Sequence, residues 1–110
     1  MTTIYHLVTP HAWETNRDQP YRADSLAGEG FIHCSFAAQV AASANRFYGK
    51  QSKLLLLHID PSLLTSPLRE EASGTGEVFP HIYGPLNRAA VVVVEALTRG
   101  EDGGWRFNGS

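Results

Sequence analysis

Residues 79–85 read Phe-Pro-His-Ile-Tyr-Gly-Pro, a run too short and too rich in backbone-shaping residues for a helix. The two prolines fix φ and remove backbone donors, so the segment between them is extended or turned. Because side chains alternate along an extended segment, His81 and Tyr83 point the same way. The sequence predicts a strand that enters a turn here, and its imidazole and phenol either line a site or serve as structural residues.

Two further histidines lie in short strand-like runs. Residues 30–35 predict a strand with His33 and Ser35 on one face, and residues 4–8 predict another strand that carries His6. One histidine in a strand is usually structural, but several beside polar or aromatic neighbours favour a shared cleft. We therefore expect three imidazoles to line one concave surface, with Ser35 and Tyr83 on its wall: His6, His33 and His81.

The remaining elements follow from apolar periodicity and from stop signals. The expected helices are residues 10–17 with Thr9 as cap, one turn within 21–30 capped by Asp24 or Ser25, residues 35–48 with Ser35 as cap and Gly49 as stop, and one turn at 61–64. The expected strands are residues 53–60, in which His58 is interpreted as structural, residues 89–97 buried on both faces, and an edge strand at 103–107 with Trp105 and Phe107 inward. This mixed order predicts one α+β domain over residues 1–110.

Composition limits the class of protein. The chain has 110 residues and a formal charge of −2, which gives no electrostatic reason to bind long nucleic acid or an anionic membrane. The single cysteine, Cys34, excludes an intrachain disulfide and suits a reducing compartment. With no signal-peptide or membrane-spanning pattern, we expect a cytoplasmic protein, and its oligomeric state stays open.

The common catalytic motifs are missing from the sequence, which contains no phosphate-binding glycine loop and no Gly-x-Ser-x-Gly elbow. Strand-borne histidines could ligate zinc, so a His-ligated metal site is a third, less favoured alternative, but no close spacing singles out a metal and we expect none. Cys34 follows His33 directly and so faces the other side of the strand. We interpret it as a small core residue rather than as a nucleophile.

Four segments carry a family resemblance: Ile4-Tyr5-His6, Gly30-Phe31-Ile32-His33-Cys34-Ser35 with Gln39, Leu56-Leu57-His58-Ile59-Asp60, and Phe79-Pro80-His81-Ile82-Tyr83-Gly84-Pro85-Leu86. Together they resemble a family of short bacterial proteins catalogued as domain of unknown function 952. That family looks like a compact form of the ADP-ribosyltransferase-like fold. The resemblance implies a curved, split antiparallel sheet with flanking helices and a nucleotide-sized cleft where its halves part.

The resemblance also implies site residues. His6 matches the strand whose His or Arg holds the adenosine-side ribose of NAD, and His33 with Ser35 matches a pattern of RNA 2'-phosphotransferases. In the toxin transferases a third site residue, on a later strand, is often Glu. The nearest candidates for that position here are His81 and Tyr83, with Glu77 just before them. The implied catalytic residues are His6, His33 and His81, and the implied cofactor-binding residues are Ser35, Tyr83 and Tyr21, with NAD as a substrate.

Two functions remain open. One is an enzyme, a transferase or a glycohydrolase, acting on NAD, an ADP-ribose-like nucleotide or a 2'-phosphorylated nucleotide. The other is a catalytically silent module that binds a nucleotide or small metabolite. The missing glutamate favours the module, and the density of titratable side chains favours the enzyme. In both, the helix expected from Ser35 would turn its N-terminus towards an anion.

Overall fold

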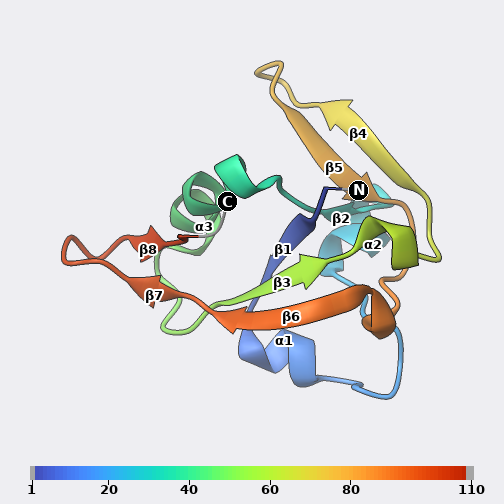
Figure 1. Ribbon diagram of the computed structural model, residues 1–110, viewed down its shortest axis with the longest axis horizontal. Helices are drawn as coiled ribbons and strands as arrows, with labels where there is room; N and C mark the ends of the chain where they lie inside the picture. The colour runs from blue at the N-terminus through green and yellow to red at the C-terminus, as the bar shows by residue number, and fades with distance from the viewer. Residues whose placement is uncertain (1, 109–110) are drawn as a thin grey trace.

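Two three-stranded antiparallel sheets organise the chain, whose computed structural model describes residues 2–108 (Figure 1). The ends of the predicted domain, residues 1 and 109–110, lie outside this range. The first sheet has the order β1-β3-β6, formed by β1 (Ile4–Val8), β3 (Leu55–Ile59) and β6 (Val91–Ala96). The second has the order β2-β5-β4, formed by β2 (Ile32–His33), β5 (Val78–Ile82) and β4 (Leu68–Ala72). A small hairpin joins β7 (Thr98–Arg99) to β8 (Trp105–Arg106).

Short helical segments connect and cover these sheets. They are α1 (Pro10–Glu14), α2 (Asp24–Glu29) and α3 (Val40–Tyr48), with 3-10 turns η1 (Ala37–Gln39), η2 (Pro61–Leu63) and η3 (Arg88–Ala90). The α+β prediction is therefore confirmed as a small mixed domain with antiparallel sheets and few helices. None of the helices between residues 2 and 108 is long and apolar enough to cross a membrane.

An isolated bridge between Tyr5 and Ser35 joins the two sheets. The N–H of Tyr5 donates to the carbonyl of Ser35 over 2.9 Å, and the N–H of Ser35 donates back over 2.7 Å. The β4–β5 hairpin projects away from the first sheet (Figure 1). This pair of backbone hydrogen bonds therefore links the first strand of one sheet to the segment that follows β2 of the other.

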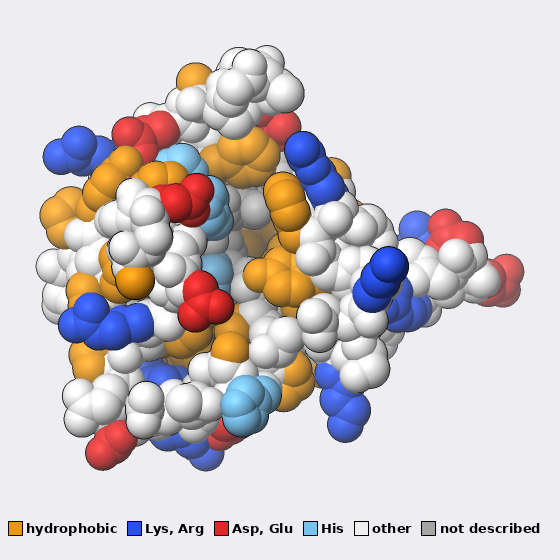
Figure 2. Space-filling view, turned by 180° about the vertical axis from the view of Figure 1, so that it is seen from behind, with side chains coloured by type: hydrophobic (Ala, Val, Ile, Leu, Met, Phe, Trp, Pro, Cys, Tyr) orange, Lys and Arg blue, Asp and Glu red, His pale blue; other side chains and the backbone are white. Residues whose placement is uncertain are grey.

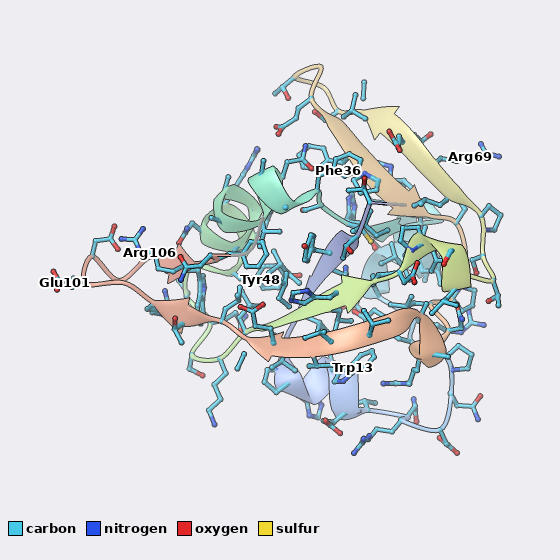
Figure 3. The ribbon with its side chains drawn as sticks, in the orientation of Figure 1. Trp13, Phe36, Tyr48, Arg69, Glu101 and Arg106 are labelled. Atoms are coloured by element: carbon cyan, nitrogen blue, oxygen red, sulfur yellow. The ribbon has the colours of Figure 1, made fainter. Side chains whose placement is uncertain are left out.

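The two faces of the first sheet pack into separate cores. Ile4 and Val8 of β1 join a cluster with Leu57 of β3 and with Ile32 and Ile82 of the second sheet. We call this cluster the first core. Figure 3 labels Trp13, the residue of α1 that packs into it.

The second core lies on the opposite face of the first sheet. Here Tyr5 and Leu7 pack against Val40 and Ala44 of α3 and against Trp105 of β8. Trp105 is buried as predicted, and Cys34 is buried in the first core as predicted. The side chains of β1 thus alternate, because Ile4 and Val8 enter the first core while Tyr5 and Leu7 enter the second.

The caps of two helical segments differ from the prediction, and that of α1 agrees with it. Thr9 caps α1 as expected, since its Oγ1 accepts from the N–H of Ala12. The residue before α2 is Ala23, so neither Asp24 nor Ser25 is the cap. Ser35 does not cap a helix either, because its backbone is used in the bridge to Tyr5. The helical segment begins after Phe36 instead.

Two strands differ more strongly from expectation. Residues 68–72 form β4, which we did not predict because a run of charged residues weakens the apolar signal. The valines of β6 were predicted to be buried on both faces, and this is wrong. β6 is the last strand of its sheet, and Val92, Val93 and Val94 are 55%, 48% and 45% exposed. An apolar run fixes a strand but not its place in the sheet.

Candidate functional site

Pairing of β2 with β5 brings two of the predicted histidines together. His33 lies opposite His81, and their ring centroids are 5.4 Å apart. The ring of Phe31 stacks on His81 at 4.1 Å and lies 5.3 Å from the ring of Tyr83. We call these four side chains the histidine face: Phe31, His33, His81 and Tyr83. Figure 2 shows histidine side chains along one wall of a hollow, with hydrophobic side chains on the facing wall.

Strand β4 supplies a carboxylate to this face. Glu71 accepts a hydrogen bond from the hydroxyl of Tyr83 at 2.5 Å, and its Oε1 lies 2.9 Å from Nδ1 of His81. The bond from Tyr83 and then that from His81 hold the pKa of Glu71 below its usual value. The same bond to Glu71 raises the pKa of Tyr83. The carboxyl is therefore ionised and the phenol neutral at neutral pH.

A second carboxylate meets the face from α2. Oε2 of Glu29 lies 2.6 Å from Nε2 of His33, whose side chain is 55% exposed. Gly30, at φ 89°, ends α2 and turns the chain into β2. The guanidinium of Arg69 lies 5.0 Å from the ring centre of Tyr83, on the β4 side, where Figure 3 labels it. The histidine face thus carries two acidic groups and one basic group at its border.

His6 does not share this face, and the expectation that three imidazoles line one surface is wrong. In β1, His6 pairs with Leu57 and lies between Ile4 and Val8, all members of the first core. The side chain of His33 points the opposite way from its neighbours Ile32 and Cys34, which belong to that core. The register at the bridge decides this outcome, because it places odd residues of β1 and β2 on one face. Alternation within each strand cannot reveal it.

The surroundings of His6 explain its burial. Its Nδ1 lies 2.6 Å from the carbonyl oxygen of His33, and its Nε2 lies 2.9 Å from the hydroxyl of Tyr21. Since a carbonyl only accepts, Nδ1 carries the proton and Nε2 accepts from Tyr21. Burial lowers the pKa of His6 to about 4, so the ring is neutral at neutral pH. Both ring nitrogens are occupied by protein partners.

Tyr21 also lies away from the histidine face, contrary to the expected stacking position. It is buried in the first core, where its ring centre is 5.8 Å from that of Trp13. Its backbone bonds to Leu86 in both directions. Burial raises its pKa, so the hydroxyl stays protonated and can donate to His6. Tyr21 thus holds His6, which in turn bonds to the backbone of β2 on the core side of the sheet.

Ser35 lies on the same side of its strand as His33, but it is buried, and the helical segment that follows begins after Phe36. The expected anion site at that segment is not formed. The N–H of Phe36 donates to Oε1 of Gln39, and the side-chain amide of Gln39 donates to Glu77. The N–H of Phe36 is therefore already bonded within the chain. The carboxylate of Glu77 lies next to this cap and would repel an anion.

Sequence reasoning missed Glu71 and Phe31 as members of the site. The signal for Glu71 was available, because residues 69 and 71 share a face once residues 68–72 are taken as a strand. His58 bonds to Glu95 at 2.8 Å and meets the ring of Tyr5 edge-on, in accord with its structural interpretation. Within residues 2–108, no three His, Cys, Asp or Glu side chains gather in a way that could hold a metal ion.

Comparison with known proteins supports the family resemblance. A family model described as "Protein of unknown function (DUF952)" matches residues 7–94. The crystal structure of protein CC0527 from Caulobacter crescentus superposes with a TM-score of 0.85 at 30% identity, over 96% of this chain and 94% of that one. The solution NMR structure of CC0527 gives a TM-score of 0.78 at 30% identity, over 94% and 91% of the two chains. No curated protein matches the sequence significantly.

Proposed function

We propose that the histidine face binds a nucleotide of the NAD or ADP-ribose class. The chain belongs to the family described as protein of unknown function (DUF952). The observation that carries this proposal is the ordered cluster of Phe31, His33, His81 and Tyr83, fixed by Glu71. Aromatic rings beside hydrogen-bonding groups suit a ligand with a flat base and a hydroxylated sugar.

Each residue has a distinct role in this proposal. His33 and His81 hydrogen-bond the sugar, while Phe31 and Tyr83 offer ring surface for the base. Ser35 closes the inner end of the face. His6 and Tyr21 do not touch the ligand. They hold the backbone of β2 from the other side, because His6 bonds to the carbonyl of His33.

The arrangement of the sheets also supports this ligand class. Two antiparallel sheets joined at a bridge fit the split sheet of the ADP-ribosyltransferase-like fold, in which a nucleotide lies where the halves part. The lone, buried Cys34 fits a cytoplasmic protein.

A second candidate function is catalysis on the same ligand, as a transferase or a glycohydrolase that releases nicotinamide from NAD. Glu71 favours it, because a carboxylate fixed against an imidazole orients that group for proton transfer or for holding a ribose hydroxyl. The silent binding module needs the same residues but no turnover. Binding and nicotinamide release therefore have to be measured separately.

Calorimetric titration with NAD and with ADP-ribose tests the proposal. We expect His33→Ala to weaken binding by about 1–3 kcal/mol and to leave the melting temperature unchanged, because it removes a ligand bond from a half-exposed side chain. His11→Ala is the matched control, an exposed histidine on α1. Nicotinamide release by the wild type selects the enzyme. Absence of binding by the wild type, or a large loss of stability with unchanged affinity in the variant, refutes the proposed role of His33.

A further inference from the structure

Strand β6 leaves one edge of the molecule open. Because the bridge between Tyr5 and Ser35 joins the two sheets, their strands follow one another in the order β4-β5-β2-β1-β3-β6. The outermost strands of this row are β4 and β6 (Figure 1). Within residues 2–108, neither has a strand on its outer side. The row therefore has two edges at which a further strand could pair.

The two edges differ in charge. β4 reads Leu-Arg-Glu-Glu-Ala, and charged side chains of this kind discourage pairing with another chain. β6 reads Val-Val-Val-Val-Glu-Ala, with neither a lysine nor a proline. The helix drawn beside β6 in Figure 1, α1, packs into the first core through Trp13. Val92, Val93 and Val94 nevertheless stay about half-exposed, so β6 is the unprotected edge.

The hydrogen bonds of β6 indicate which of its backbone groups face outward. The N–H of Leu97 donates to the carbonyl of Leu54 over 3.0 Å. In an antiparallel pair, successive residues alternate between bonding to the partner strand and facing away from it. Glu95 therefore bonds to β3, while Val94 and Ala96 direct their N–H and carbonyl groups away from β3. Such a row of donors and acceptors is complementary to an extended strand.

We propose that β6 pairs with β6 of a second copy of this chain, antiparallel and about a two-fold axis at Val94, and so forms a dimer. The edge is self-complementary in this register, because Val94 lies opposite its own counterpart and Glu95 lies opposite Val93 of the partner subunit. No two carboxylates face each other directly, and Glu95 already bonds to His58 of its own chain at 2.8 Å. The dimer does not involve the histidine face and is independent of the proposed function.

Pairing of β6 with β4 of another copy fits the edges less well. It would set valines against the charged side chains of Arg69, Glu70 and Glu71. It would also leave an open edge at each end, so that copies could add without limit, whereas two-fold pairing closes after two copies. One pair of short strands is a small interface, at the low end of the areas of specific complexes. We therefore expect a dimer that dissociates at micromolar concentration.

Sedimentation equilibrium from micromolar to millimolar protein concentration measures the association. We expect the wild type to shift from monomer to dimer and not beyond. Val94→Lys should raise the dissociation constant by about tenfold or more, because it sets two ammonium groups opposite each other at the axis. Val78→Lys is the matched control, since Val78 is a strand valine, 42% exposed, in β5 of the other sheet.

Two further measurements locate the interface. Opposite residues of a hydrogen-bonded antiparallel pair have Cα atoms about 5.5 Å apart, within reach of a disulfide. On oxidation, Val94→Cys should therefore give a covalent dimer and Val78→Cys should not, and Cys34 is buried and does not compete. In the wild type, amide hydrogen exchange of Val94 and Ala96 should slow as the protein concentration rises. The amide of Glu95, bonded to β3, should be protected at every concentration.

Each outcome supports or overturns the proposal. A wild type that stays monomeric up to millimolar concentration overturns it. A dimer that Val94→Lys and Val78→Lys weaken equally has its interface elsewhere, which overturns it as well. Growth beyond the dimer contradicts the two-fold pairing and indicates pairing of β6 with β4. If Val94→Lys does not fold, the cysteine cross-link and the exchange rates of the wild type decide.

Discussion

His6 and His33 are joined by a 2.6 Å hydrogen bond between an imidazole nitrogen and a backbone carbonyl, although their side chains leave the sheet on opposite faces. One histidine therefore holds the backbone from which the other is presented. The two residues were expected to act side by side on a ligand. The structure instead gives them consecutive places in one chain of contacts, from Tyr21 through His6 to the strand of His33.

Acid should destabilise the protein through His6. Its pKa is lowered by burial to about 4 in the folded chain from an ordinary value of 6.5, so the unfolded chain binds the proton more readily. The contribution of the neutral ring is complete above pH 6.5 and is lost as the pH falls towards 4, by about 3 kcal/mol in the free energy of unfolding. Urea denaturation at several pH values measures it. His6→Gln is the control, because it keeps every other titrating group. If wild type and variant show the same pH dependence, His6 is not the cause.

Removing the hydroxyl of Tyr21 should destabilise the fold. Tyr21→Phe leaves Nε2 of His6 as a buried acceptor without its donor, which costs about 1–3 kcal/mol. Tyr48→Phe provides the comparison, since the hydroxyl of Tyr48 lies 3.5 Å from the carbonyl of Leu7 and contributes little. Thermal and chemical denaturation of both variants measure the difference. An equal loss in the two variants would show that the bond to His6 is unimportant.

Two glycines close together in sequence should respond in opposite directions. Gly30 has φ 89° at the end of α2, so Gly30→Ala should cost about 1–2 kcal/mol. Gly28 lies inside α2, where an added Cβ meets nothing within 4 Å, so Gly28→Ala should stabilise the protein by about 0.5–1 kcal/mol. Chemical denaturation of both variants measures the change in the free energy of unfolding. Stabilisation by Gly30→Ala would mean that α2 does not end in this turn.

The sequence predicts what is local. The strand at residues 4–8, the cap at Thr9 and the burial of Cys34 and Trp105 all follow from alternation, turn residues or hydrophobicity, and all are observed. The shared face of His33 and His81 also followed, because both strands place their odd residues on the side away from the core. The position of Glu71 was missed, because the charged run around it masks a strand.

The register between strands could not be predicted. Whether His6 shares a face with His33 depends on which residue of β1 pairs with which residue after β2, and a shift of one position would reverse it. The same limit applies to β6, since four valines in a row look alike in a central strand and in an edge strand. Ser35 was expected to cap a helix because its hydroxyl suits that place. Its backbone instead serves the pairing with Tyr5, a partner distant in sequence.

The interleaved pairing of the strands has a consequence for how the chain folds. β1 must find β3 and β2 must find β5, and each of these pairs closes a loop of more than 40 residues that overlaps the other. Only β4 and β5, among the strands of the two three-stranded sheets, are joined by a short turn. Long loops lose entropy before their contacts form, so this topology has a high contact order. We therefore expect the domain to fold slowly for its size, with the β4–β5 hairpin as the element that is able to form before the rest.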